Sequence, residues 1–509
     1  MNNLNFLVDV LKESPVFKTL EKNVKPGRTV CASGLSTINK SNIIYALCRL
    51  KGVTAFCLAS DEKEAQTLCN DLSCMGLRAY VYPVRDFNFL DFQSRSHEYE
   101  HARLKVLLKL LNHECDVAIA CVDAAAHLTV PRNVLEQSVI EFEEGKELSL
   151  EKATKALTLL GYERFDAVEG SGQFSLRGGI LDFFMPDSDY PVRCEFWGDE
   201  ITDLSYFDIE TQRRFKKADK ITLSPSTEIV IEDRAALADK IEHKAKLLRS
   251  KNSAKAKEKL FSEAELIRSG AMIANADKFI NQIYDKPESL FDYFDRNTLV
   301  FASEFTAIQE RGKSMDFISN ETLMQGFEDG TLCRGFDRFA LTFNECTEFL
   351  QSHGTIVLEN FVHGSMPIKL SEIISFSTKQ LSAWGGSYKQ LKEDVDGLFT
   401  PESKGVIFAG TERAAKNLCD TFNADGINAV YSEGADKISK GELLVMQGAL
   451  SAGFEYPSQK FFAITYSQVS YRPEKSKKKK KKTGQEIYSL SELAPGDYVV
   501  HNVHGIGGF

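Results

Sequence analysis

Short apolar runs alternate with longer helical patterns through residues 1–138, and this alternation most narrows the possible folds. The apolar runs Val53 to Leu58 and Val117 to Val122 lie on either side of a helical pattern from Asp61 to Met75. Strands and helices that alternate at this spacing form a parallel sheet covered by helices. The same pattern returns after Gly405, so the sequence predicts an α/β protein with more than one parallel sheet. Further helical patterns cover 1–21, 42–51, 101–111 and 240–271.

The pattern changes between residues 139 and 220. A helix is expected over 149–161, and alternating strands follow it as far as Phe215. This region predicts a small α+β domain inserted into the first α/β unit. Because 509 residues are too many for one core, we divide the chain into 1–138 (domain 1a), 139–220 (the insert), 221–370 (domain 1b), 371–470 (a third α/β domain), 471–486 (a lysine-rich linker) and 487–509 (the start of a further domain).

Composition places the chain among ordinary cytoplasmic proteins. Apolar residues make up 43% and charged residues 26% of the sequence, and no apolar run approaches the roughly 20 residues of a membrane span. The N-terminus has no basic region followed by a cleavage site, and the eleven scattered cysteines suggest reduced thiols. We therefore expect no membrane partner. We also expect no metal, because His501 and His504 have no cysteine or carboxylate partners nearby.

Net charge argues against a large nucleic-acid footprint. The chain carries −10 overall, whereas such footprints need clustered Lys and Arg. One basic run, Lys477 to Lys482, stands between Arg472-Pro473 and Thr483-Gly484. We interpret it as a solvated, self-repelling linker, with DNA contact as the alternative.

Near the N-terminus the stretch GLSTINKS, Gly34 to Ser41, differs from a phosphate-binding loop at one position. Asn39 stands where the pattern G-x-x-x-x-G-K-[ST] requires glycine. Lys40 and Ser41 match the residues that reach phosphate and magnesium, and the strand–loop–helix context is right. The asparagine side chain would intrude where the backbone must curl around phosphate.

The other parts of a nucleotide hydrolase are missing from the sequence. Hydrolysis needs an acidic magnesium ligand, a residue that positions water and usually an arginine finger. Val117 to Asp123 resembles an acidic strand end, but Ala124 follows where glutamate is expected, and no helicase box occurs. We expect no catalytic residue and no cofactor in this chain, with the loop serving a structural role.

The stretch from Ser175 to Arg214 is the most distinctive, and it reads SLRGGILDFFMPDSDYPVRCEFWGDEITDLSYFDIETQRR. It resembles the module shared by the nucleotide-excision-repair protein UvrB and the transcription-repair coupling factors (Mfd). In both, this signature marks the domain that binds UvrA. Three further stretches resemble Mfd rather than UvrB: Tyr82 to Leu111, Leu444 to Val469 and Leu490 to Phe509. UvrB would also have an intact phosphate loop.

The resemblance to the Mfd family carries several expectations. The α/β domains should be degenerate helicase-like (RecA-type) sheets, with Lys40 and Ser41 facing solvent at a helix start. Full-length members are ATP-dependent DNA translocases that use ATP and magnesium, displace stalled RNA polymerase through its beta subunit, and recruit UvrA in transcription-coupled DNA repair. This chain would carry recruitment and lack the motor. The alternative is a divergent nucleotide-binding UvrB-like protein that recognises damage.

The resemblance also assigns UvrA-binding residues in the insert. Arg177, Arg193 and Trp197 match the contact positions, and Gly178, Gly179, Asp182 and Glu200 are expected to support them. Strand alternation independently puts Arg193, Glu195 and Trp197 on one face, and Arg and Trp are common interface hot spots. From the residues alone, two other readings stay open: Trp197 could pack on a helix of its own domain, and Arg193 could pair with Glu195 or Glu200.

Overall fold

A computed structural model gives the structure of the chain, and most of it can be described. The described residues are 4–85, 97–249, 253–270, 276–330, 332–362, 366, 368–385, 387–466, 498–501 and 505–508. The lysine run and His504 lie outside them. Strands β24 (Tyr498–His501) and β25 (Gly505–Gly508) form a separate antiparallel pair near the C-terminus.

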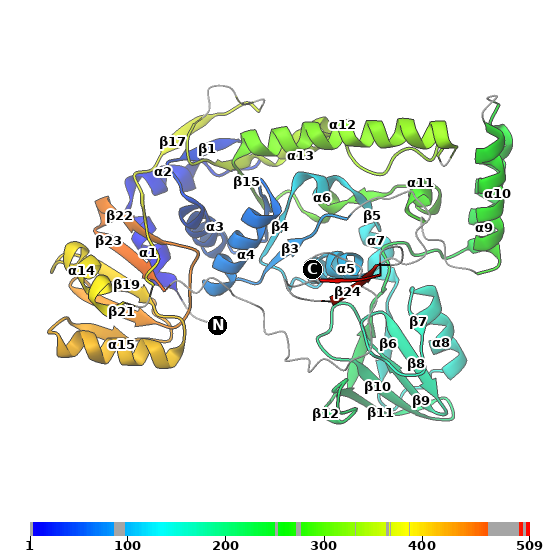
Figure 1. Cartoon of the computed structure of the whole chain (residues 1–509), viewed down its shortest axis with the longest axis horizontal. Helices are drawn as coiled ribbons and strands as arrows, with labels where there is room; N and C mark the ends of the chain where they lie inside the picture. Colours follow the sequence, from blue (N-terminus) through cyan, green and yellow to red (C-terminus); the bar gives the residue numbers. More distant parts are fainter. Residues whose placement is uncertain are drawn as a thin grey trace.

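A seven-stranded parallel sheet forms the centre of the first domain (Figure 1). Its order is β17-β1-β16-β15-β2-β4-β3, so strands from both sides of the insert lie side by side. Domains 1a and 1b therefore share one sheet, and β17 extends it beyond the predicted boundary at residue 370, because β17 pairs with β1. The strands are β1 (Val30–Ser33), β2 (Ala55–Leu58), β3 (Ala79–Tyr82), β4 (Val117–Ala120), β15 (Leu299–Ser303), β16 (Thr355–Leu358) and β17 (Glu372–Ser375).

Helices surround this sheet, and several begin or end away from their predicted positions. The helix predicted over 1–21 is two helices, because Ser14 caps the second and Pro15 opens it. The helix predicted from Asn42 begins at Thr37, and Val122 starts a helix instead of ending a strand. The helices are α1 (Asn5–Glu13), α2 (Pro15–Asn23), α3 (Thr37–Lys51), α4 (Glu62–Cys74), α5 (Glu98–Leu111), α6 (Val122–Ala126), α7 (Arg132–Gln137), α12 (Phe305–Asp329) and α13 (Phe343–His353).

A helical hairpin and short elements complete the domain. The stretch 240–271, predicted as one helix, contains parts of two that pack on each other. The elements are α9 (Arg234–Leu247), α10 (Ser253–Arg268), α11 (Ile280–Ile283), the 3₁₀ turns Ala276–Phe279 and Leu290–Tyr293, and the short pair β5 (Leu128–Thr129) and β14 (Glu288–Ser289). Of the helices that the structure describes, none combines the length and the apolar character that crossing a lipid bilayer demands.

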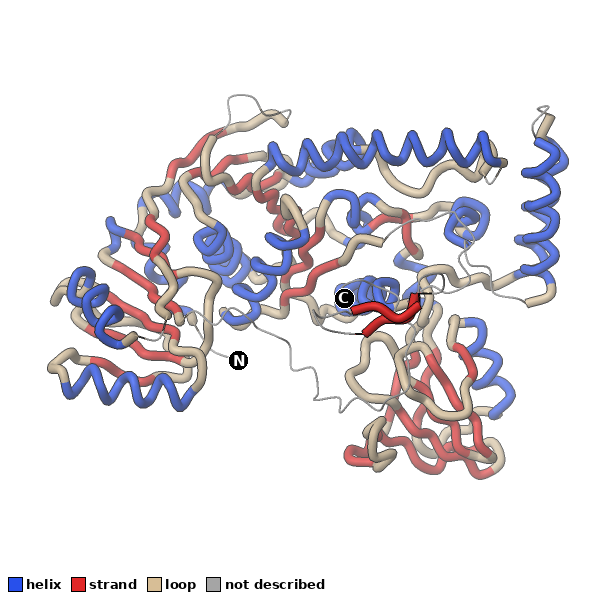
Figure 2. Tube along the Cα trace, in the orientation of Figure 1, coloured by secondary structure: helices blue, strands red, loops and turns tan. Residues whose placement is uncertain are grey.

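The insert is a six-stranded sheet with one helix against it (Figure 2). The sheet order is β12-β11-β10-β9-β8-β7, and all neighbours are antiparallel except β7 and β8. β6 (Ile140–Glu143) pairs with β13 (Lys220–Leu223), so the chain enters and leaves the insert side by side. The other elements are β7 (Glu163–Arg164), β8 (Gln173–Arg177), β9 (Ile180–Phe183), β10 (Val192–Trp197), β11 (Glu200–Phe207), β12 (Arg214–Lys217) and α8 (Leu150–Leu159).

The third domain is a second, mostly parallel sheet. Its order is β18-β22-β23-β19-β21-β20, with β18 and β22 antiparallel at one edge. One buried apolar cluster contains side chains of this sheet and of the first domain, so the two pack together. The elements are β18 (Lys379–Leu381), α14 (Tyr388–Leu398), β19 (Lys404–Phe408), α15 (Glu412–Ala424), β20 (Ala429–Tyr431), β21 (Glu442–Met446), β22 (Gly453–Tyr456), the 3₁₀ turn Pro457–Gln459 and β23 (Phe461–Thr465).

Candidate functional site

Three neighbouring strands of the insert bring two arginines to one aspartate. Arg193 on β10 lies directly opposite Asp182 on β9, and Asp182 lies opposite Ser175 on β8. Arg177 ends β8 on the same face, two positions beyond Ser175. Strand alternation therefore determines the cluster, because residues two apart on a strand and residues in register share a face.

Asp182 binds both arginines from a buried position. Its side chain is 1% exposed. Arg193 donates to it from Nε at 2.7 Å and from Nη2 at 2.8 Å, and Arg177 donates from Nη2 at 2.8 Å. The two-bond contact with Arg193 has the fork geometry of strong arginine–carboxylate pairs. Hydrogen bonding to Asp182 raises the pKa of the Arg193 guanidinium. Arg193 thus pairs with Asp182, not with Glu195 or Glu200.

Arg193 is also held from its other side. Its Nη1 donates to the backbone oxygen of Gln212 at 3.2 Å, and its Nη2 donates to Gln212 Oε1 at 3.0 Å. The guanidinium lies over the buried ring of Phe207, 4.4 Å from its centroid. Only 14% of the Arg193 side chain is exposed, and its hydrogen bonds are made within the insert.

The turn that carries Gln212 is built around Asp208. The Asp208 carboxylate accepts from the backbone N–H and the hydroxyl of Thr211, each at 2.8 Å. Gln212 follows with a φ of 58°, a left-handed conformation that is uncommon outside glycine. Its side-chain Nε2 donates to the Ile209 oxygen. Backbone strain of this kind persists where surrounding contacts impose it. Here the strained residue Gln212 accepts two hydrogen bonds from Arg193.

Trp197 and Arg177 are the exposed members of this face. Trp197, at the end of β10, is 82% exposed, so the reading that it packs on a helix of its own domain is wrong. Half of the Arg177 side chain is exposed. Val192, Cys194 and Phe196, which alternate with these residues along β10, are buried as expected.

The supporting residues divide into those near the arginines and those near the tryptophan. Gly179 allows a close approach, since a Cβ there would lie 2.7 Å from the Phe196 oxygen, and Gly178 has a φ of +63°. Glu200 lies across the hairpin turn from Trp197. The arginines donate to Asp182 and Gln212 rather than to Glu200, and a supporting role of Glu200 in the site stays a prediction. Gln212 was not predicted as a site residue, although it lies in the quoted signature.

The second candidate site is the loop Gly34 to Ser41, whose first two backbone donors are already used. Gly34 N–H donates to the Asn360 oxygen and Leu35 N–H to the Glu359 oxygen, both at 3.1 Å. A Cβ on Gly34 would lie 2.2 Å from the Phe376 oxygen, so only glycine fits. The segments after β16 and β17 therefore lie against the loop where a phosphate would have to sit.

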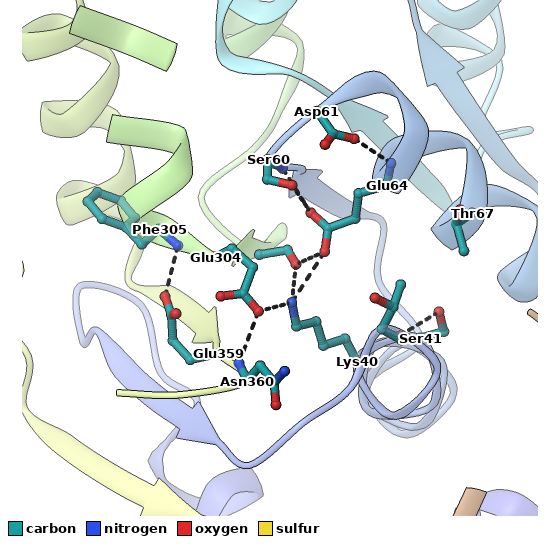
Figure 3. Close-up of polar contacts among 12 residues, drawn as sticks. Lys40, Ser41, Ser60, Asp61, Glu64, Thr67, Glu304, Phe305, Glu359 and Asn360 are labelled. Atoms are coloured by element: carbon teal, nitrogen blue, oxygen red, sulfur yellow. Dashed lines mark hydrogen bonds and ion pairs between the residues drawn. The ribbon is translucent and has the colours of Figure 1, made fainter. Parts of the chain in front are cut away.

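Lys40 is enclosed by acceptors from three elements (Figure 3). Its Nζ lies 3.2 Å from Glu64 Oε1, 2.9 Å from Ser303 Oγ and 2.5 Å from Glu304 Oε1. The side chain is 2% exposed. Three acceptors satisfy the three donors of an ammonium group. The expectation that Lys40 faces solvent is wrong, because α3 begins at Thr37 and places this residue over the sheet edge.

Ser41 and Asn39 are buried as well. Ser41 Oγ donates to the Thr37 oxygen and to Asp71 Oδ2, both at 3.2 Å. Asp71 in turn accepts from the backbone N–H and hydroxyl of Ser451 in the third domain, both at 2.7 Å. Asn39 lies inside α3, where Ser36 Oγ donates to its Oδ1 at 2.7 Å. Ser41 was also expected to face solvent. This prediction is wrong, because α3 is buried against α4 and the third domain.

The charge around Lys40 is acidic. Glu359 at the end of β16 is fully buried and accepts from Phe305 N–H at 2.8 Å. Burial raises the pKa of its carboxyl to about 7, with further elevation from Glu304. Glu64 and Glu304 complete a set of three carboxyls near one lysine. These residues do not fit ATP, because the lysine and serine are already paired and the carboxyls repel phosphate.

Comparison with known proteins identifies the class of the insert. The family model for the UvrB interaction domain matches residues 140–229, a region that begins at β6 and continues past its partner strand β13. The chain is therefore an α/β multidomain protein that carries a UvrB interaction domain.

Relatives that match over most of the chain include transcription-repair-coupling factors, which confirms the resemblance drawn from the sequence. That of Bacillus subtilis is 28% identical over 98% of this chain and 43% of its own length. That of Staphylococcus epidermidis strain RP62A is 26% identical over 84% of this chain and 37% of its own. That of Staphylococcus aureus strain MRSA252 is 23% identical over 99% and 44%. The chain spans less than half the length of these relatives.

Proposed function

We propose that this chain recruits UvrA in transcription-coupled DNA repair, and that the insert provides the binding surface. The observation that carries the proposal is that two exposed side chains, Arg177 and Trp197, lie next to the buried ionic cluster of Asp182 and Arg193. Trp197 is 82% exposed and Arg177 half exposed, while Asp182 and the Gln212 turn hold the strands beneath them. This surface lies inside the region that matches the UvrB interaction domain.

The chemistry of the two exposed residues suits a protein partner. A partner that covers Trp197 removes a large aromatic side chain from water, and such anchors contribute about 2 kcal/mol or more each at interface centres. Arg177 bonds to Asp182 through Nη2, and the exposed part of its guanidinium can donate to a carboxylate of the partner. We assign Arg193 the role of a positioning residue, because its donors are taken up within the insert.

For the whole protein we propose the activity that the name of its relatives implies. A motor outside this chain would hydrolyse ATP with magnesium, move on DNA and displace a stalled RNA polymerase bound through its beta subunit. The insert would then deliver UvrA to the exposed lesion. The alternative, a nucleotide-binding UvrB-like protein that recognises damage, predicts ATP binding at Lys40, and the ion pairs of Lys40 with Glu64 and Glu304 oppose it.

Isothermal titration calorimetry with purified UvrA tests the recruitment proposal. The Arg177→Ala/Trp197→Ala variant should lose on the order of 3 kcal/mol of binding free energy or more, as expected for two hot-spot residues. A matched control is Arg164→Ala/Phe165→Ala, which removes an exposed arginine and an exposed aromatic at the edge strand β7 of the same sheet.

Retention of wild-type affinity by the control and loss by the first variant would support the proposal. Equal affinities of the two variants would reject the assigned surface. Absence of binding by the wild-type chain would reject recruitment by this chain.

A further inference from the structure

Helix α12 (Phe305–Asp329) runs along the top of the molecule in Figure 1 and packs on the first domain through one of its faces. The buried residues of this inner face are three or four positions apart, as helical periodicity requires: Phe305, Ile308, Gly312 and Met315. A Cβ on Gly312 would lie 2.1 Å from the Phe343 ring of α13, so the two helices are in close contact there. This packing determines which residues of α12 point away from the domain.

The opposite face of α12 carries three large apolar side chains that are exposed to solvent. Phe317 is 66% exposed, Ile318 62% and Met324 61%. Phe317 and Met324 are seven positions apart, close to two helical turns, so they lie in one row along the helix, and Ile318 flanks this row. Single exposed apolar residues are common, whereas a contiguous exposed apolar patch marks an interaction site.

The stability of the domain does not account for this patch. The hydrophobic effect stabilises a fold in proportion to the apolar area that folding removes from water, and most of the area of these three side chains stays in water. Phenylalanine and methionine are enriched in protein interfaces, and methionine adapts its shape to a partner. The composition of the patch therefore indicates a protein-binding surface.

Acidic residues share the row with the apolar side chains. Glu310 and Glu321 lie seven positions before and four positions after Phe317, and Glu328 lies four positions after Met324. Residues at these spacings are neighbours on one helix face. All three glutamates are exposed, and none of them forms an ion pair within the part of the chain that the structure describes. A partner that covers the patch therefore meets negative charge along the whole row.

We propose that the outer face of α12 docks an amphipathic helix of a partner protein, in which lysine and arginine flank an apolar stripe. The apolar stripe covers Phe317 and Met324, whose spacing of seven residues is the repeat by which two long helices meet. The flanking cations pair with the three glutamates, because a carboxylate that a partner covers without a counter-ion costs free energy.

The charge of this face opposes other occupants. The exposed charged residues of α12 are four acidic residues, the three glutamates and Asp329, and one basic residue, Lys313. A second copy of the chain that paired through the same face would bring the acidic rows together, and like charges on neighbouring helix faces are destabilising. Nucleic acid is opposed for the same reason, because its phosphates are negative.

Fluorescence anisotropy with two labelled, designed peptides tests the proposal. Both peptides have about 18 residues, or five helical turns, and both carry leucine on one face. The other face carries lysine in the first peptide and glutamate in the second. The lysine peptide should bind the wild-type chain saturably and lose affinity as salt rises, whereas the glutamate peptide should not bind.

Two variants of α12 separate the apolar and the acidic parts of the face. Phe317→Ser/Met324→Ser should weaken binding of the lysine peptide by on the order of tenfold or more, as the loss of two interface anchors implies. Glu310→Gln/Glu321→Gln/Glu328→Gln should also weaken it, and should reduce the dependence of its affinity on salt.

Two control variants make matched changes elsewhere on the surface. Leu266→Ser/Val430→Ser removes two exposed apolar side chains. Glu151→Gln/Glu393→Gln/Glu433→Gln removes three exposed carboxylates. Both controls should bind the lysine peptide as wild type does. Because every substituted residue is exposed, circular dichroism melting should show that all four variants are folded.

Unchanged affinity of either α12 variant for the lysine peptide would overturn the proposal, and so would an equal loss in its matched control. Equal binding of the two peptides, or no binding of the lysine peptide by wild type, would overturn it as well. Sedimentation that showed wild-type dimers and a monomeric Phe317→Ser/Met324→Ser variant would assign the face to a second copy instead. The α12 variants should keep the wild-type affinity for UvrA, so these outcomes do not depend on the recruitment proposal.

Discussion

Arg193 and Asp182 face each other across β10 and β9 and share two hydrogen bonds of 2.7 and 2.8 Å. Arg177 donates a third bond to the same buried carboxylate. The surface assigned to UvrA therefore has an ionic base beneath an exposed arginine and an exposed tryptophan. Because the base is formed by three strands, its loss should affect both folding and binding.

Substitution of Asp182 by alanine should destabilise the insert. The change leaves Arg193, which is mostly buried, without its carboxylate, and breaking a buried ion pair from one side costs about 3–5 kcal/mol. Urea denaturation followed by circular dichroism measures the loss. Asp189→Ala, which removes an exposed aspartate of the insert that pairs with Lys105 on α5, is the control and should change stability by less than about 1 kcal/mol.

Gln212 should contribute to UvrA binding through Arg193. Gln212→Ala removes the Oε1 acceptor of Arg193 Nη2, so the guanidinium gains freedom and affinity should fall by roughly 1 kcal/mol. In a double-mutant cycle, adding Gln212→Ala to Arg193→Ala should cause little further loss. Additive losses in UvrA affinity would mean that Gln212 acts independently of Arg193.

Restoring glycine to the phosphate-loop position should not restore nucleotide binding. In Asn39→Gly the amides of Gly34 and Leu35 still donate to the oxygens of Asn360 and Glu359, and Lys40 keeps its carboxylates. A fluorescent ATP analogue titrated into wild type and variant should give no saturable signal in either. Saturable binding by the variant that Lys40→Met abolishes would contradict this prediction.

Removal of Lys40 should be more harmful than removal of an exposed lysine on the next helix. Lys40→Met leaves Glu64 and Glu304 without their shared cation at a buried site, and we expect a loss of about 3 kcal/mol or more. Lys63→Met, on the exposed face of α4, is the matched control and should lie within about 0.5 kcal/mol of wild type. Thermal and urea unfolding of both variants measure the difference.

Glu359 should make stability fall as pH rises. Its pKa is raised in the folded state from 4.5 to about 7, so between these values the native protein holds a proton that the unfolded chain has released. Stability therefore declines as pH rises through this window. Glu359→Gln should flatten the decline and stabilise the protein at pH 8 by about 1–3 kcal/mol. A decline of the same size in the variant would assign it to another group.

Local patterns predicted much of the fold. The strands around β2, β4, β19 and β10 follow from apolar runs and strict alternation, because a strand buried on one or both faces shows this in its sequence. Two errors came from helices: the stretch 1–21 breaks at Ser14 and Pro15, and the stretch 240–271 contains a turn between α9 and α10. Helical periodicity alone did not show either break.

Long-range partners account for what the sequence could not predict at the sites. Lys40 is paired with Glu304, 264 residues away along the chain, and Asp71 contacts Ser451 in another domain. No local sequence pattern predicts such contacts, so Lys40 was expected to face solvent.

The contacts of α3 with the third domain have a mechanical consequence. In a nucleotide-driven motor, the helix after the phosphate loop borders a gap that opens and closes with each cycle. Here Asp71 joins Ser41 to Ser451, and Asn42 donates to the Tyr456 hydroxyl at 3.0 Å. These contacts close the gap, so the sheets of the first and third domains should move together as one rigid body. The insert projects from these two sheets on its paired strands β6 and β13, and contacts with α5, such as the Lys105–Asp189 ion pair, also set its direction.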